Sequence, residues 1–145
     1  MTNETSWVQT IAATFVCIVV YFFLLYFVAP IVEYLVRQFG IFFVPNRFGG
    51  GSEVDNPGIL NLAFRMTMAS GLSACAAFIA SSSVCSNAHA KTVAIVFALA
   101  ITVWALLFVD VGDLAVSLMP LFKVLITAAT ALVVALCAWY GDFWR

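Results

Sequence analysis

Long apolar segments alternate with short polar segments along the chain, and this pattern predicts helices that cross a membrane. A helix needs about 20 predominantly apolar residues to span the hydrocarbon core of a bilayer. Four segments approach or exceed that length, at residues 8–29, 59–84, 92–109 and 120–140. We therefore expect an all-α integral membrane protein with four transmembrane helices, which form a single domain over residues 1–145.

The first apolar segment raises the alternative of a secretory signal peptide. It carries no charge between Val8 and Val28 and is preceded by Trp7, a residue type enriched at membrane interfaces. The residues before Trp7 include Glu4 but no Lys or Arg, and the apolar run is longer than the core of a signal peptide. We interpret this segment as a retained membrane span.

The segment that follows the first span is also predicted to be helical. Residues 31–39 carry apolar side chains at four-residue spacing, and Glu33 stands four residues before Arg37, an order that favours an ion pair on a helix. Two interpretations remain open: an additional amphipathic helix at the membrane surface, or an extension of the first helix beyond Pro30. Residues 46–58 contain three consecutive glycines, which indicate a flexible loop.

The composition supports lipid as the solvent of this chain. Apolar residues make up 65% of the sequence and charged residues only 9%, which is too few to cover a water-soluble protein of this size. This balance excludes a cytosolic enzyme and a disordered tail. The sequence also lacks the stripe of basic residues that a nucleic-acid-binding protein needs. The expected partners are the lipid bilayer and other membrane proteins or further copies of this chain.

The distribution of basic residues predicts an orientation. Four spans place both termini on the same side of the membrane, and we expect an inner or plasma membrane rather than an outer membrane. The side of the first and third connections carries most of the basic residues, namely Arg37, Arg47, Arg65 and Lys123, against Lys91 and Arg145 opposite. The positive-inside rule then favours cytoplasmic connections and exported termini.

Small residues recur along two of the spans at a spacing that suits close helix packing in lipid. These predicted helix-packing positions are Ala69, Ser73 and Ala77 in the second span and Thr127, Ala131 and Ala135 in the fourth. The first span is bulky instead. Its large side chains suit lipid or the groove of a partner, and they are Phe15, Tyr21, Phe22, Phe23, Tyr26 and Phe27.

Ionisable residues at the span ends are the main candidates for a functional site, because charges near the membrane core are costly. Arg65, Asp110, Asp113 and Lys123 all fall on one predicted side and could form the mouth of an ion or substrate path. The favoured interpretation is interfacial anchoring with a salt bridge. No span carries a charge at its midpoint, as a proton-coupled carrier would require.

Other candidate chemistry is sparse. His89 stands four residues after Cys85, so a continuous helix would place both on one face, where they could ligate a metal or a haem. Two ligands do not complete a metal site, and we expect no metal and no cofactor. The four cysteines have no paired spacing that would indicate a disulfide framework.

These patterns favour a non-catalytic role. We expect a small integral membrane subunit, not an enzyme, that packs with partner helices in a larger or homo-oligomeric complex. The leading alternative is a small oligomeric transporter or channel with Arg65, Asp110, Asp113 and Lys123 at its mouth. A redox membrane anchor that uses His89 is a third interpretation.

Overall fold

All the regular structure described for this chain is helical. A computed structural model describes residues 2–39, 59–85, 88–107 and 119–141. The helices in these residues are α1 (Thr2–Gln38), α2 (Ile59–Val84), α3 (Ala90–Leu107) and α5 (Met119–Tyr140). Each is long and apolar enough to cross a membrane, which confirms the prediction of four such helices.

α1 continues through Pro30 without interruption. The ring of Pro30 removes one backbone donor, yet the helix persists to Gln38. Arg37 donates a 2.6 Å hydrogen bond to Glu33, which confirms the pair expected from their spacing. Residues 31–38 are thus the extension of the first helix, and a separate amphipathic helix is not confirmed. With 37 residues, α1 is about 56 Å long, whereas the 18 residues of α3 span about 27 Å.

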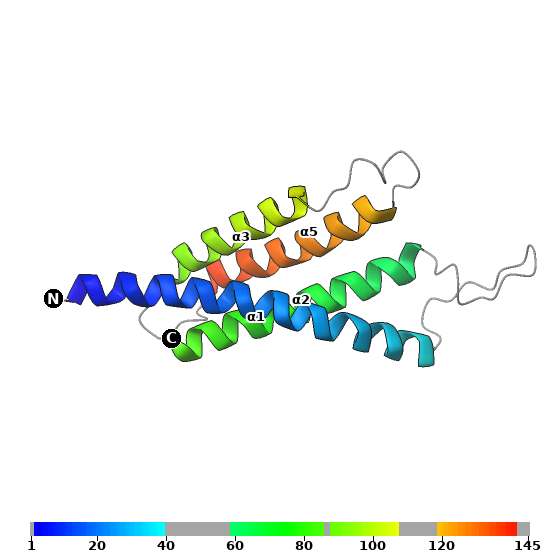
Figure 1. Ribbon diagram of the computed structural model, residues 1–145, viewed down its shortest axis with the longest axis horizontal. Coiled ribbons are helices and arrows are strands. Elements are labelled where there is room, and N and C mark those ends of the chain that lie inside the picture. The colour runs from blue at the N-terminus through cyan, green and yellow to red at the C-terminus, as the bar shows by residue number, and fades with distance from the viewer. Residues whose placement is uncertain (1, 40–58, 86–87, 108–118, 142–145) are drawn as a thin grey trace, which may run out of the picture.

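The four helices form a closed ring in which each packs against two neighbours. α1 packs against α2 and α3, and α5 packs against the same two helices (Figure 1). Consecutive helices run in opposite directions, so the bundle has two ends. We call them the Trp7 end, where α1 and α3 begin, and the Glu33 end, where α2 and α5 begin.

The centre of the bundle is filled by three aromatic rings from three helices. Phe97 of α3 lies between Tyr21 of α1 and Phe78 of α2, with ring centroids at 5.3 Å and 5.0 Å and edge-on geometry. All three side chains are fully buried. Edge-to-face pairs at these distances stabilise a core beyond the area that they bury. The position of Tyr21 differs from the expectation that the aromatic residues of the first span face lipid or a partner.

α5 approaches its neighbours closely because its inward face is made of small side chains. The buried apolar residues of this helix are all alanines, at positions 128, 131, 135 and 138. Gly71 of α2 lies opposite Thr130, whose methyl carbon would be 3.4 Å from a Cβ atom at position 71. Small residues at such contacts allow helix backbones to come together.

The outer surface of the bundle carries the large apolar side chains. Ile11 and Phe15 of α1 are about 70% exposed, and Leu106 and Leu107 of α3 are exposed to a similar degree. The interior, by contrast, contains many Ala and Ser residues beside its few aromatic rings. This distribution reverses that of a water-soluble bundle, in which the large apolar residues are concentrated inside.

Replacement of the central ring tests this description of the core. We expect Phe97→Ala to lower the free energy of unfolding by about 3 kcal/mol, because the surrounding rings cannot close the cavity. Leu99→Ala, on the exposed side of the same helix, is the matched control and should change it by much less. The measurement is denaturant titration in detergent micelles followed by circular dichroism. Equal losses for the two variants would contradict this core.

Candidate functional site

A cluster of three charged side chains lies at the Glu33 end. Arg65 of α2 is buried, and its Nη1 atom donates to Glu33 Oε1 of α1 at 2.9 Å. Arg37 donates to the same carboxylate oxygen from one turn further along α1. One carboxylate thus lies between two guanidinium groups, and the pair between Arg65 and Glu33 joins two helices.

The environment of Arg65 is more enclosed than that of its partners. Its side chain is 9% exposed, whereas those of Glu33 and Arg37 are 41% and 47% exposed. Its Nε atom is buried without a hydrogen-bond partner, and the buried Asn61 lies one turn before it on α2. This arrangement holds a charge in place between helices, with the more exposed carboxylate between Arg65 and solvent.

The predicted mouth of an ion path is described only in part. Arg65 contacts Glu33, a partner that the sequence did not reveal because the two residues lie on different helices. Lys123 is exposed on α5. Asp110 and Asp113 lie outside the described residues, so the suggested cluster of all four stays a prediction.

A chain of hydroxyl contacts crosses the middle of the bundle. Ser70 Oγ of α2 donates to the Thr127 carbonyl of α5 at 2.7 Å, and the Tyr21 hydroxyl of α1 lies 3.0 Å from the same Ser70 oxygen. Because the Ser70 proton points to Thr127, Tyr21 must be the donor to Ser70. Ser81 adds a second link, from its hydroxyl to the Ala13 carbonyl of α1 at 2.8 Å.

The predicted helix-packing positions all lie inside this one chain. Their side chains are buried, and they are Ala69, Ser73 and Ala77 on α2 and Thr127, Ala131 and Ala135 on α5. Ala69, for example, packs in a cluster with Val32 and Val36 of α1. The small-residue faces are therefore largely occupied by the chain's own helices.

The Trp7 end is closed by contacts between α1, α3 and α5. The His89 amide donates to Thr10 Oγ1 at 3.0 Å, and the rings of His89 and Trp7 lie 5.2 Å apart. Lys91 lies over the ring of Trp139 at 5.8 Å, within the range of a cation–π contact. Aromatic and basic residues meet here as they do at membrane interfaces.

The pairing of Cys85 with His89 that a continuous helix would allow is not found. α2 ends at Val84 and α3 begins at Ala90, so the two residues lie between helices. Cys85 is buried while His89 is exposed. Within the described part of the chain, no three His, Cys, Asp or Glu side chains are grouped so that they could hold a metal ion.

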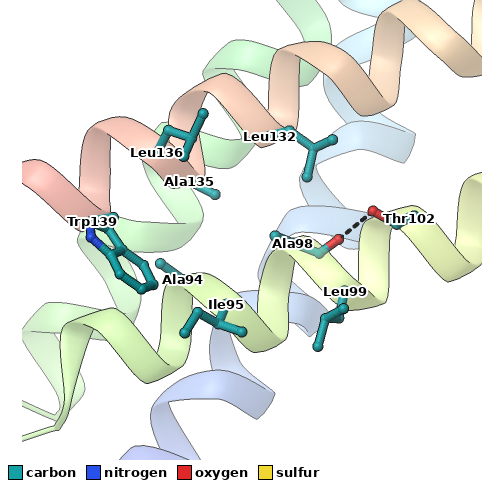
Figure 2. Close-up of a pocket in the computed structure, with 9 residues that line it drawn as sticks. All are labelled: Ala94, Ile95, Ala98, Leu99, Thr102, Leu132, Ala135, Leu136 and Trp139. Carbon is teal, nitrogen blue, oxygen red and sulfur yellow. Dashed lines mark hydrogen bonds between the residues drawn. The ribbon is translucent and has the colours of Figure 1, made fainter.

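An apolar groove of about 370 Å³ runs between α3 and α5 on the outside of the bundle (Figure 2). We call it the α3–α5 groove. Ala94 and Ala98 of α3 and Ala135 of α5 supply its small side chains. Larger side chains border it from both helices, and these are Ile95, Leu99, Leu132, Leu136 and Trp139.

The architecture thus defines a class: a bundle of four apolar, antiparallel helices with a polar link across its middle and one charged cluster at an end. Comparison with protein families, with curated proteins and with solved structures finds no match to this chain. Its function must therefore be inferred from the geometry described above.

Arg65 should contribute more to stability than Arg37, although both contact Glu33. We expect Arg65→Met to lower the free energy of unfolding by about 2 kcal/mol, because a charge-assisted bond between helices is lost. Arg37→Met is the matched control and should cost less than about 1 kcal/mol, since exposed pairs within one helix are weak. Denaturant titration in micelles measures both. A larger loss for Arg37→Met would contradict the bridging role of Arg65.

The hydroxyl link should behave as one unit. We expect Ser70→Ala to cost about 1 kcal/mol, the scale of hydrogen bonds between helices in lipid. Ser83→Ala is the control, because that exposed hydroxyl donates to the Ile79 carbonyl of its own helix and not to a neighbouring helix among the described residues. The double variant with Tyr21→Phe should lose less than the sum of the single losses. Full additivity in a double-mutant cycle would refute the link.

Proposed function

We propose that this chain is a multi-pass integral membrane protein that serves as a non-catalytic subunit and packs with partner helices. The observation that carries the proposal is the reversed distribution of side chains, with large apolar residues outside and small residues inside. Such a surface is stable only where lipid tails or other apolar helices cover it.

The positions of the interface residues agree with a transmembrane arrangement. If Trp7 marks one interface, the 30 Å hydrocarbon core ends after about 20 residues of α1, near Phe27. Glu33 then lies about 9 Å further along the helix axis. The cluster of Glu33, Arg37 and Arg65 would sit at headgroup level, which supports an anchoring role for these charges.

The filled interior of the bundle favours a role as a subunit of a complex over transport by a single copy of the chain. Tyr21, Phe78 and Phe97 occupy the centre of the ring, so a single copy leaves little room for a polar path among its described residues. The α3–α5 groove offers a partner helix an apolar surface from two helices, in which the partly buried Ala98 is a small residue that permits close backbone approach in lipid.

The proposed orientation of the chain in the membrane is the one that the distribution of basic residues favours. Glu33, Arg37 and Arg65 lie at the end where the first and third connections begin, which the positive-inside rule assigns to the cytoplasm. The ends of α1 and α5 at the Trp7 end would then face away from it. An inner or plasma membrane is the expected location.

An oligomeric transporter is the second candidate, and the burial of Arg65 favours it. A buried cation within a helix that can cross a membrane is a functional candidate by default. Ion flux into proteoliposomes that contain only this chain distinguishes the two functions. Flux that disappears in Arg65→Gln would support transport over the subunit role.

Filling the groove tests the subunit role. We expect Ala98→Phe to abolish co-purification of the partner chain, or of further copies, from native membranes in a mild detergent, because the added ring occupies the α3–α5 groove. Val103→Phe, an exposed position of α3 that does not line the groove, is the matched control and should preserve the complex. The measurement is affinity purification followed by mass determination of the intact assembly.

Two outcomes would contradict the proposal. One is a wild-type chain that purifies alone and as a monomer from its native membrane. The other is an assembly that survives Ala98→Phe unchanged while the thermal unfolding midpoint of that variant shows that it is folded.

A further inference from the structure

A small hollow and an apolar groove lie next to each other at the Trp7 end, beside α3. The hollow has a volume of about 330 Å³ and is lined by Trp7, His89, Ala90, Lys91 and Thr92. We call it the Lys91 hollow. The side chains of His89, Lys91 and Thr92 border it at the start of α3.

The apolar groove continues from this hollow between α1 and α3. It has a volume of about 340 Å³ and shares Trp7 and Thr92 with the hollow, so the two spaces are neighbours. Ile11, Phe15 and Ile18 of α1 and Val96 of α3 supply its apolar lining. We call it the α1–α3 groove.

Two of the three threonines that line the groove, Thr10 and Thr14, add little polarity to it. Thr14 Oγ1 donates to the Thr10 carbonyl at 2.8 Å, and Thr10 Oγ1 accepts the His89 amide at 3.0 Å. Both hydroxyl groups are thus engaged within the protein. Charged and polar side chains are therefore found at the hollow, whereas the groove is almost entirely apolar.

We propose that the Lys91 hollow and the α1–α3 groove together bind one phospholipid with an anionic headgroup. The ammonium of Lys91 complements the charge of a phosphate, and the groove receives an acyl chain. This inference rests on the proposed insertion in a membrane, but it does not depend on the partner subunit.

The dimensions favour a lipid chain over a partner helix at this groove. Its lining on α1 extends from Trp7 to Ile18, which is about 17 Å along the helix. That is close to half of the 30 Å hydrocarbon core, the depth that one leaflet contributes. A partner helix would contact the bundle across the whole core. The α3–α5 groove, which has the small and partly buried Ala98 in its lining, suits helix contact instead (Figure 2).

The position of the Lys91 hollow along the bundle also agrees with the depth at which lipid headgroups lie. Lys91 lies over the ring of Trp139 and lines the same hollow as Trp7. Tryptophan rings collect at the headgroup level of a bilayer, and lysines close to the surface attract anionic lipids. The cation is therefore placed at the depth where phosphates lie.

Native mass spectrometry of the full chain with added phosphatidylglycerol or phosphatidylcholine tests the site. We expect the wild-type chain to bind phosphatidylglycerol about fivefold more tightly than phosphatidylcholine, the effect of one basic residue near an anionic lipid. Lys91→Gln should remove this preference. Lys123→Gln, which removes an exposed lysine at the opposite end, is the matched control and should retain it.

A groove variant tests the acyl chain separately. Val96→Phe places a ring in the α1–α3 groove and should weaken both lipids by a similar factor, whatever their headgroup. Unchanged binding of both lipids to this variant, or a full preference for phosphatidylglycerol in Lys91→Gln, would overturn the proposal. Displacement of phosphatidylglycerol by free glycerol phosphate would also overturn it, since the headgroup alone would then suffice.

Flotation with phosphatidylcholine vesicles separates this proposal from the proposed function. If the wild-type chain floats with the vesicles and resists alkaline extraction, a missing lipid preference counts against the Lys91 site alone. If the chain does not float, the membrane insertion fails, and the lipid site fails with it.

Discussion

The hydroxyl of Ser70 determines which face of α2 turns inward. In lipid, an apolar helix gains nothing from hiding one apolar face rather than another, so hydrophobicity does not choose its rotation. Ser70 contacts both Tyr21 of α1 and the Thr127 carbonyl of α5, and this can occur at only one rotation of α2. Ser81 repeats the constraint three turns later with the Ala13 carbonyl. The aromatic core and the position of Arg65 both depend on this choice of face.

Side-chain size then determines how closely the other helices of the bundle approach one another. Alanines on α5 let it approach α2 and α3, while three rings fill the wider space between α1, α2 and α3. The same sorting leaves the outer side of α3 bordered by two grooves of different character. One lies between α3 and α5 and has alanines in its lining, and the other lies between α1 and α3 beside the Lys91 hollow at the Trp7 end.

The helices themselves could be predicted from the sequence, because an uncharged run of sufficient length has few other stable forms in lipid. The second predicted span, residues 59–84, has the same bounds as α2. For the first, an extension of the helix beyond Pro30 was one of the two interpretations left open, and α1 does continue to Gln38. The pair of Glu33 and Arg37 was also predictable, because it depends only on local spacing.

Contacts between distant segments were not predictable in the same way. Arg65 was assigned to a cluster with Asp110, Asp113 and Lys123 by its side of the membrane, whereas its described partner is Glu33. Tyr21 was grouped with the outward aromatic residues of the first span, although it lies in the core. In both cases the sequence signal gives depth along a helix but not rotation about it.

A last consequence follows from α1, which has twice as many residues as α3. In the proposed bilayer, the uncharged run from Val8 to Val28 already spans the hydrocarbon core, so the remainder of α1 would project beyond that core at the Glu33 end.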